Sequence, residues 1–368
     1  MEEWKEYKAI DFCENVTDGT HDSPRYQDCG HYLITSKHLK NNQIDFSSAK
    51  IISEADYQRI IVRSGVEQYD ILFSMIGTIG NIVRVIDSEV DFAVKNMGIF
   101  KMGKDKHKSS WLYYWLKSTK AEEYMQQQLA GSTQAYLTLN SLRNCPVFYP
   151  GKEYAHKVIS ILSSLDDKIE LNRRINDNLE QQAFTIFDEL FPNITDGEHK
   201  IEEWIKPKRG IGLLTKDANK GDVPVVAGGL NPAAYHDKAN TSSPVVTISA
   251  SGANAGYVAL WNIPVWSSDS SYIDASMTEN VYFWYVMLKK RQKEIFDAQT
   301  GSAQPHIYPQ HIAEMPIRQI DKDLMRKYTE KVTPLFRLIG KRIEENIKLA
   351  SIRDTLLPRL MSGELKIS

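Results

Sequence analysis

Five side chains of the kinds that bind metal ions lie within the first forty residues: Cys13, His21, Cys29, His31 and His38. Thiolate and imidazole groups are the usual ligands of zinc, which they bind tetrahedrally. The spacing of these five residues matches no zinc-finger pattern, in which ligands recur as close pairs at set separations. Structural roles are therefore the better interpretation, and we predict no metal site.

A second set of residues invites comparison with DNA-modifying enzymes. NPAAY at residues 231–235 is the nearest approach to the N/D-P-P-Y/F motif that holds the amino group of a flipped base. It lacks the second proline and has an extra residue before the tyrosine. No Gly-rich methyl-donor loop, GxxxxGK[ST] phosphate loop or GxSxG serine elbow occurs. GTIGN, from Gly77, fits a turn between strands better than a phosphate-binding loop.

The charged residues do not supply a catalytic centre either. Asp91 and Lys95 are best explained by a salt bridge at a strand edge. The acidic pairs at 166–167 and 344–345 are interpreted as solvated faces of long helices. We therefore predict a non-enzymatic protein whose role is binding.

The chain contains two copies of one unit. ILFSMIGTIGNIVRV from Ile71 matches VVTISASGANAGYVAL from Val245, and this pairs Ser74 with Ser249. GSTQAYLTLNSLRNCPV from Gly131 matches GSAQPHIYPQHIAEMPI from Gly301 in the same order. LFPNITDGEHKIEEW, in mid-chain, matches the last residues, LLPRLMSGELKIS, followed by the first, MEEW. Several ordered matches indicate a tandem duplication.

The two copies differ most just after each Glu-Glu-Trp, at residues 12–43 and 210–240. The offset between matched segments also shrinks along the chain, because the first copy carries extra residues, mostly before Ile71. A shared frame with divergent inserts indicates one scaffold that presents two different binding surfaces.

The pattern of apolar residues predicts an α+β fold. Residues 71–100 and 245–275 alternate apolar and polar side chains, as strands do, and amphipathic helices beginning at Trp111 and Val281 run into the GSxQ turns. Aromatic residues in these helices are interpreted as core. We expect pseudo-symmetric α/β domains at 1–150 and 192–320, and long helices at 151–191 and at 321–368, the latter with a tail.

Both long helices carry apolar residues at alternating steps of three and four, the spacing of a coiled-coil seam. We therefore predict an antiparallel coiled coil, with two ordinary surface helices as the alternative. A seam asparagine in each helix would fix the register of the pair. Each stripe covers about 28 residues, or roughly 42 Å of helix. The residues predicted to form this coiled-coil seam or the interface with other subunits are Leu165, Ile169, Asn172, Leu179, Ile339, Ile343, Asn346 and Leu349. The repeat of the two chain ends further predicts that the C-terminal tail lies next to the N-terminus.

The length, composition and net charge of the chain limit the classes of protein to which it can belong. A chain of 368 residues with 42% hydrophobic and 25% charged residues is an ordinary globular protein of two-domain length. No membrane span or signal peptide is apparent, and three cysteines without a CxxC pair favour a reducing cytoplasm. The net charge of −2 argues against a protein that coats DNA by charge alone.

The whole layout resembles the specificity (S) subunit of type I restriction-modification systems. The GSTQAYL and GSAQPHI turns, the two long helices and the C-terminal IRDTLLPRLMSGELKI carry this resemblance. It implies two target recognition domains, each recognising one half of a split double-stranded DNA site. The helices would set the gap and dock two methyltransferase (modification) subunits, with a restriction (translocating endonuclease) subunit as an optional further partner. S-adenosylmethionine would belong to the methyltransferase, so no cofactor is expected on this chain.

Within this resemblance, polar side chains on the divergent loops are the candidates for DNA contact. They are Thr20, His21, Arg25, Tyr26, Lys37, Gln134 and Tyr136 in the first domain, and Lys216, Lys220, Asn231, His236, Lys238, Gln304, His306 and Tyr308 in the second. For each of them ordinary loop chemistry is the alternative. For Gln134 and Gln304 a further alternative is a structural role, in which the side chain hydrogen-bonds backbone groups of its own turn.

Two other functions compete with this one. A coiled-coil interaction scaffold or anti-restriction decoy would share the helices but would not recognise DNA sequence. The recognition portion of a single-chain restriction enzyme is disfavoured, because the chain lacks catalytic motifs.

Overall fold

The computed structural model describes residues 4–131, 134–301, 304–365 and 367. Parts of the sequence repeats therefore lie outside the described residues, namely Glu2, Glu3, Ser132, Thr133, Ser302, Ala303 and Lys366. The chain divides into two compact units. Unit 1 contains residues 1–167 and 349–368, and unit 2 contains residues 168–348, so each unit takes part of both long helices.

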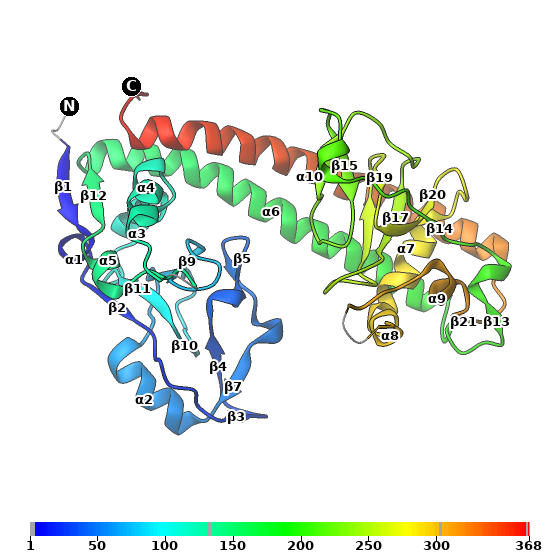
Figure 1. Ribbon diagram of the computed structural model, residues 1–368, viewed down its shortest axis with the longest axis horizontal. Helices are drawn as coiled ribbons and strands as arrows, with labels where there is room; N and C mark the ends of the chain where they lie inside the picture. The colour runs from blue at the N-terminus through cyan, green and yellow to red at the C-terminus, as the bar shows by residue number, and fades with distance from the viewer. Residues whose placement is uncertain (1–3, 132–133, 302–303, 366, 368) are drawn as a thin grey trace. The chain divides into compact units, whose positions relative to one another are not determined.

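Unit 1 is built on small sheets (Figure 1). One is antiparallel in the order β2-β11-β8-β9 (Asn15–Asp18, Met97–Lys101, Ile71–Ser74, Ile82–Arg84). A second has the order β10-β4-β7-β3 (Phe92–Val94, His31–Ile34, Lys50–Ile52, Tyr26–Gln27), in which β10 and β4 are parallel. Two antiparallel pairs complete the set, β1-β12 (Lys5–Lys8, Pro146–Tyr149) and β5-β6 (Leu39–Lys40, Gln43–Ile44).

The helices of unit 1 surround these sheets. They are α1 (Ala9–Phe12), α2 (Glu54–Ser64), α3 (Lys106–Leu116), α4 (Thr119–Gln127) and α5 (Leu139–Arg143), with short 3-10 turns η1 (Ser36–His38) and η2 (Phe46–Ser48). Helix α3 is the centre of the core. Its Trp111 and Trp115 are fully buried, and their indole N–H groups donate to the carbonyls of Phe148 (2.9 Å) and Pro146 (2.6 Å) on β12. The prediction that these aromatic residues are core is confirmed.

Unit 2 has the same plan. Its sheets are β14-β20-β17-β18 (Lys208–Arg209, Ser270–Asp274, Val245–Ser249, Val258–Trp261), β16-β15-β19 (Ala234–His236, Val223–Val226, Trp266–Ser267) and β13-β21 (His199–Lys200, Pro316–Ile317). Its short helices are α7 (Val281–Lys290), α8 (Gln292–Asp297) and α9 (Pro309–Ala313), with η3 (Ile201–Glu203) and η4 (Thr215–Asp217). Every residue of α7 from Val281 to Leu288 is buried, as expected for a core helix.

Strand pairing confirms the duplication. The aligned serines Ser74 and Ser249 end the equivalent strands β8 and β17, and each strand pairs antiparallel with two neighbours in the same order. The smaller sheets also agree, since β4 is parallel to β10 as β15 is parallel to β19. Unit 1 additionally contains α2, β3 and the β5-β6 pair, all before Ile71. These elements account for the shrinking offset between the two copies.

The long helices are α6 (Lys152–Leu190) and α10 (Lys322–Met361), compared with the expected 151–191 and 321–368. Within unit 2 they run antiparallel, because Tyr328 on α10 donates its hydroxyl to the carbonyl of Ala183 (3.1 Å) while Asn346 contacts Asn172. Among the described residues, no helix combines the length and the apolar character that crossing a membrane requires.

The predicted seam asparagines form the centre of the helix pair in unit 2. Asn172 is fully buried, and its amide donates to Asn346 (2.8 Å) and to the carboxylate of Glu345 (2.7 Å). Arg342 donates to the amide oxygen of Asn172 (2.9 Å), and Asn346 donates to the carbonyl of Ile169 (3.2 Å). A shift of one helix along the other would break these hydrogen bonds and leave buried amide groups without partners. The contacts therefore fix one register of the two helices.

The remaining seam predictions divide into two groups. Ile169 is buried, and Leu165, Leu179, Ile339 and Leu349 are partly buried. Ile343 is 46% exposed, so its assignment to the seam is wrong. The reason is local, because the polar contacts of Arg342, Glu345 and Asn346 turn those side chains toward α6 and leave Ile343 facing outward.

The same helices run antiparallel in unit 1. Tyr154 on α6 donates to the carbonyls of Leu360 (3.2 Å) and Leu365 (2.8 Å) at the end of α10. Asp166 accepts from Arg353 (2.7 Å) and from Tyr114 (2.9 Å). The interpretation of the pairs at 166–167 and 344–345 as purely solvated is therefore wrong for Asp166, and also for Glu345 in unit 2.

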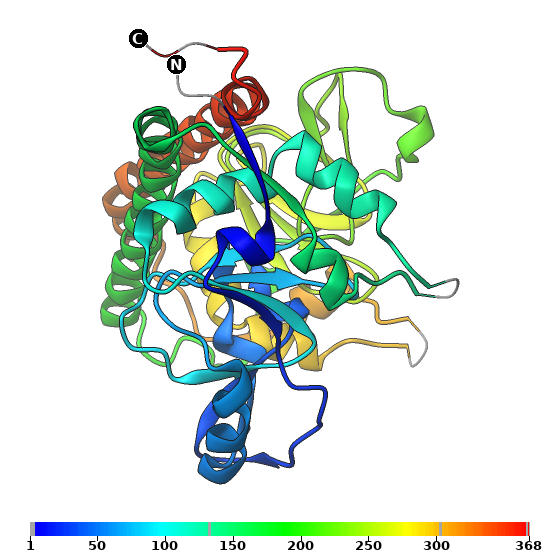
Figure 2. The same ribbon diagram turned by 90° about the vertical axis from the view of Figure 1, so that its left-hand side faces the viewer.

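The C-terminal tail of unit 1 lies next to its first strand, as the repeat predicted. A Cβ built on Gly363 would lie 3.0 Å from the indole of Trp4, so the tail packs directly against the residue that precedes β1. Figures 1 and 2 both show the start of β1 beside the end of α10. The φ of +74° at Gly363 favours glycine at this turn.

Helix α2, which has no counterpart among the described residues of unit 2, is fastened to its sheet by a histidine between two carboxylates. The ring nitrogens of His31 bond Asp91 and Glu54 (Nε2 to Oε2, 2.5 Å), and the ring stacks on Tyr57 at 3.9 Å. A carboxylate can only accept, so both nitrogens must donate and the ring carries its second proton. The hydrogen bond to Glu54 raises the pKa of His31, and Asp91 adds to this effect.

The predicted salt bridge between Asp91 and Lys95 is wrong. Asp91 bonds His31 instead, and Lys95 donates to the hydroxyl of Ser23 (2.5 Å).

Replacing Ile169 with aspartate should destabilise the helix pair strongly. The lost burial alone contributes ~1.5–3 kcal/mol, and the carboxylate would also be desolvated. Leu171, two residues away and 51% exposed, is the matched control. Chemical unfolding should show a loss of about 3 kcal/mol or more for Ile169→Asp and almost none for Leu171→Asp. Equal losses would contradict the seam assignment.

The contacts of protonated His31 with Glu54 and Asp91, here called the His31 clamp, should weaken as pH rises. Because the folded pKa is raised above the ordinary 6.5, the stabilisation is complete below pH 6.5 and is lost as pH passes the higher folded value. Hydrogen exchange of the α2 amides, corrected for intrinsic rates, should show greater protection at pH 5.5 than at pH 8.5 in the wild type. His31→Gln should remove that difference, and Glu54→Gln should shrink it. A wild type with equal protection at both pH values would refute the clamp.

Candidate nucleic-acid interface

In unit 1 the described residues at the two ends of the GSTQ segment pair with each other as a hairpin, which is fixed to the end of β8. Ala130 and Tyr136 exchange two backbone hydrogen bonds of 2.9 Å each, and the N–H of Leu137 donates to the carbonyl of Met75 (2.9 Å). Gly131 has a φ of +95°, which glycine adopts without strain. This pairing places Tyr136 opposite Ile76, at the start of the GTIG turn.

A third segment joins this hairpin and turn. A Cβ built on Gly77 would lie 3.6 Å from the hydroxyl of Ser36 in η1, next to Lys37. We define loop cluster 1 as residues 35–37, 76–80, 130–131 and 134–136. It brings together three of the predicted DNA-contact residues, Lys37, Gln134 and Tyr136, all of them exposed.

Unit 2 repeats this arrangement with different side chains. His306 and Thr300 exchange backbone hydrogen bonds of 2.8 and 3.0 Å, and the N–H of Ile307 donates to the carbonyl of Ala250 (2.9 Å). A Cβ on Gly228 would lie 2.5 Å from the carbonyl oxygen of Ser251, so the β15-β16 loop packs beside the hairpin. We define loop cluster 2 as residues 227–231, 251–254, 300–301 and 304–306.

Loop cluster 2 also gathers predicted residues. Gln304 and Asn231 are exposed, and His306 is partly exposed. Tyr308, just beyond the hairpin and 48% exposed, stacks on His306 with the ring centroids 6.0 Å apart. The two hairpins thus present Tyr136 and His306 at equivalent bridge positions opposite Ile76 and Ser251.

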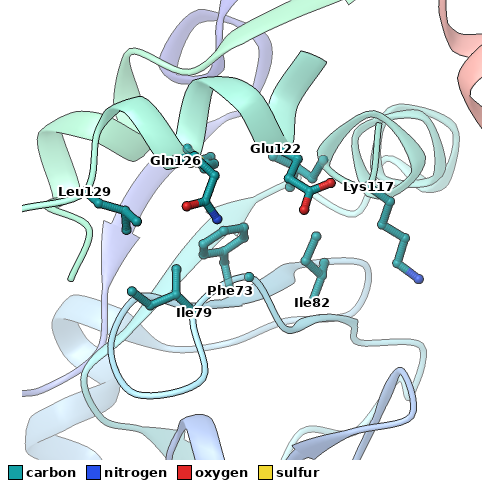
Figure 3. A pocket seen from close by; sticks show the side chains of 10 residues that line it. Phe73, Ile79, Ile82, Lys117, Glu122, Gln126 and Leu129 are labelled. Atoms are coloured by element: carbon teal, nitrogen blue, oxygen red, sulfur yellow. The ribbon is translucent and has the colours of Figure 1, made fainter. Parts of the chain in front are cut away.

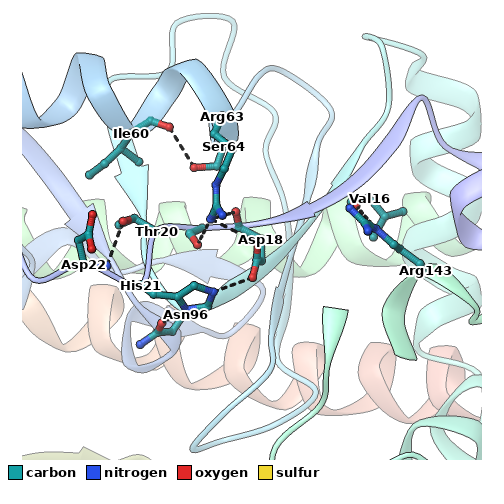
Figure 4. A network of polar contacts seen from close by, with 11 residues as sticks. Val16, Asp18, Thr20, His21, Asp22, Ile60, Arg63, Ser64, Asn96 and Arg143 are labelled. Atoms are coloured by element: carbon teal, nitrogen blue, oxygen red, sulfur yellow. Dashed lines mark hydrogen bonds and ion pairs between the residues drawn. The ribbon is translucent and has the colours of Figure 1, made fainter. Parts of the chain in front are cut away.

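A polar network in unit 1 holds the segment that follows β2 (Figure 4). His21 bonds Asn96 through Nδ1 (2.8 Å) and Asp18 through Nε2 (2.9 Å), while its side chain remains 66% exposed. Arg63 on α2 donates to Asp18 (3.3 Å) and to the carbonyl of Gly19 (2.8 Å). The imidazole is therefore fixed in orientation and still accessible, which suits recognition of a ligand.

Two of the predicted residues are buried. Thr20 is 8% exposed, and its hydroxyl accepts the N–H of Asp22 (3.1 Å). His236 is 6% exposed, accepts the N–H of Asn219 (3.0 Å) and packs edge-on against Trp266 at 5.0 Å. The expectation that Thr20 and His236 are exposed loop residues is wrong, because local hydrogen bonds turn both side chains inward.

The other predicted residues are exposed but lie outside the two loop clusters. Tyr26 is on strand β3 with the ammonium of Lys50 3.7 Å above its ring, and Arg25 precedes it. Lys216 belongs to η4, and Lys220 and Lys238 flank the β15-β16 pair. Their role in DNA contact stays a prediction.

The structure also shows residues that the sequence reasoning missed. Arg209, at the end of β14, donates to Asp269 (2.6 Å), whose second oxygen accepts the hydroxyl of Ser251 in loop cluster 2. The basic run KPKR at 206–209 was the only sequence signal, and it does not distinguish Arg209 from its neighbours.

A cavity of about 260 Å³ opens beside the GTIG turn of unit 1 (Figure 3). Phe73, Ile79, Ile82 and Leu129 line it together with Lys117, whose pKa burial lowers to about 8. Lys117 already donates to Tyr113 (2.5 Å) and to Asn42 (2.8 Å). Among the described residues, no group of three or more His, Cys, Asp or Glu side chains is suited to a metal ion.

The chain is similar to proteins of one functional class. Residues 1–181 match the family model of the type I restriction modification DNA specificity domain. The type I restriction enzyme MjaIX specificity subunit of Methanocaldococcus jannaschii is 26% identical over 311 residues, 72% of this chain and 71% of that protein. The HindI specificity subunit of Haemophilus influenzae is also 26% identical, over 52% of this chain and 41% of that protein.

A solved structure shows the same fold over the full length. The crystal structure of the type I restriction-modification S subunit from M. genitalium covers 100% of this chain and 97% of its own, with a TM-score of 0.55 and 18% identity. The duplicated frame, the antiparallel helices and these similarities agree. By these comparisons the chain is similar to specificity subunits of type I restriction-modification systems, and the family model of the DNA specificity domain matches its residues 1–181.

Proposed function

We propose that this chain selects a two-part DNA target for a type I restriction-modification complex and performs no catalysis itself. The single observation that carries the proposal is the repetition of one frame with two unlike loop clusters. Equivalent hairpins and turns recur in both units, yet the side chains they present differ, as Tyr136 differs from His306. Two different surfaces on one scaffold suit two different half-sites.

The long helices supply a surface for the partner subunits. Leu171 on α6 and Ile343 and Ile347 on α10 are 51%, 46% and 64% exposed. All three belong to unit 2, and the contact of Asn172 with Asn346 brings Leu171 and Ile347 to the same level of the helix pair. Ile343 and Ile347 lie one turn apart on α10, Leu171 is exposed on α6, and exposed apolar side chains on long helices favour burial against further helices. We assign this surface to the modification subunits.

The partner subunits would also compensate for the weak attraction of this chain to DNA phosphates. A net charge of −2 gives little general attraction for phosphates, so the modification subunits would provide much of the backbone contact. They would also hold S-adenosylmethionine, which leaves this chain without a cofactor. Cys13, Cys29 and Cys145 are free thiols, which suits action in the reducing cytoplasm.

Mapping of methylated bases tests the proposal. With its cognate modification subunits the chain should direct methylation to a gapped motif of two specific parts. Exchanging residues 1–150 for those of a relative should change one part of the motif and leave the other as it was. A scaffold or decoy would instead give no sequence-dependent methylation and no shift of any duplex, and either result would refute the proposal.

Charge on the exposed helix surface should prevent assembly while leaving the fold intact. The Leu171→Asp, Ile347→Asp double variant places two carboxylates where apolar side chains are exposed, so its unfolding free energy should change little. Co-purification with the modification subunit should fall at least tenfold. A double change of Val62 (88% exposed) and Ile86 (53% exposed) to Asp, away from the long helices, is the matched control and should assemble normally. Normal assembly of the Leu171, Ile347 variant would contradict the docking assignment.

A further inference from the structure

Arg209 lies where strand β14 ends, and its guanidinium is held from one side only. Nη2 donates to Asp269 at 2.6 Å, and the Arg209 side chain is 42% exposed. Among the described residues no other hydrogen bond of this side chain is present. An arginine has five N–H donors, so four remain for a ligand.

Asp269 is itself fixed in place. One carboxylate oxygen bonds Arg209, and the other accepts the hydroxyl of Ser251 in loop cluster 2. The backbone N–H of Ala250 also donates to the carbonyl of Asp269 (3.0 Å). The orientation of the guanidinium is thereby tied to the same strand end that supports the His306 hairpin.

The strand register identifies the equivalent residue in unit 1. The aligned serines Ser74 and Ser249 pair with Met97 and Ser270 on the neighbouring strands. One residue further along, Gly98 pairs with Asp18 and Ser271 pairs with Arg209. Asp18 and Arg209 therefore occupy the same position of the duplicated frame, with opposite charges.

Both units use this position to orient a donor group beside their loops. In unit 1 Asp18, together with Asn96, holds the exposed ring of His21. In unit 2 Asp269, which immediately precedes Ser270 as Asn96 precedes Met97, holds Arg209. In unit 1 this position holds a buried carboxylate that orients the neighbouring His21, and in unit 2 it carries the oriented donor Arg209 itself, so the two copies present different buttressed donors near the same place of the frame.

No other arginine of unit 2 has this placement. The remaining ones lie on the long helices, at the start of α8 or just after β21. Arg291, for example, is 5% exposed and bonded to Glu294, and Arg318 donates to the carbonyl of Asp196. Within the part of unit 2 that the structure describes, Arg209 is the single arginine beside loop cluster 2.

We propose that Arg209, oriented by Asp269, recognises a guanine in the half-site bound by unit 2. This inference rests on the proposed function and adds the residue and the base. A guanidinium held through one Nη2 hydrogen bond keeps its other N–H donors free, and two of them can bond the O6 and N7 acceptors of guanine in the major groove. Adenine offers a donor where guanine has O6, and the pyrimidines lack the paired acceptors, so only guanine satisfies both N–H groups.

The test uses the chain in complex with its cognate modification subunits. Methylation rates are measured on duplexes that carry each of the four bases at every position of the second half-site. The wild type should prefer guanine at one position by roughly 5- to 150-fold, the range of one bidentate pair. Arg209→Lys keeps the charge but loses the planar fork, so it should reduce that preference clearly and leave the first half-site unchanged. Asp269→Asn should weaken the same preference partially.

Arg318→Ala is the matched control and should leave every preference intact. If Arg209→Lys retains the full preference, the inference is wrong. If Arg209→Ala weakens methylation equally on all sequences and lowers the salt dependence by about one counterion, Arg209 contacts phosphate and the inference is also wrong. If the wild type itself gives no gapped motif, the proposed function fails together with the inference, whereas a gapped motif unaltered by Arg209→Lys overturns the inference alone.

Discussion

Buried amide contacts between α6 and α10 fix the register on which the fold depends. An asparagine with no exposure is costly unless its donors and its acceptor are all satisfied, and Asn172 meets this condition through Asn346, Glu345 and Arg342. Sliding one helix past the other would separate these groups and leave them buried without partners. The helix pair is therefore specified by polar chemistry, while apolar side chains such as Ile169 supply its stability.

Under the proposed function, the duplicated frame gives one chain two different recognition surfaces. Hairpins, glycine turns and strand ends recur because backbone hydrogen bonds determine them, as in the pairing of Tyr136 with Ala130 and of His306 with Thr300. Side chains at the edges of this frame are free to change without loss of the fold. The exchange of Asp18 for Arg209 at one register position is the clearest instance, since a carboxylate and a guanidinium are each held there by neighbours of matching chemistry.

Sequence patterns predicted the features that depend on local periodicity and on repetition. The long helices, the duplicated strands and the seam asparagines follow from spacing alone, and α6 ends within one residue of the expected boundary. Orientation of single polar side chains was not predictable. Thr20 and His236 turn inward to backbone N–H groups, Ile343 turns outward because its neighbours bond across the seam, and Arg209 is distinguished only by Asp269, sixty residues away in the sequence. Such outcomes depend on tertiary partners that spacing does not encode.

Under the proposed function, the gap between the two parts of the DNA target is the quantity that tests this account most directly. Deletion of one helical turn, residues 173–176, shortens α6 by about 6 Å next to the Asn172 contacts. Methylation mapping of this variant with its modification subunits should show a changed gap or no methylation. An unchanged gap at full activity would contradict the claim that the paired helices, held in one register, set the distance between the two recognition surfaces.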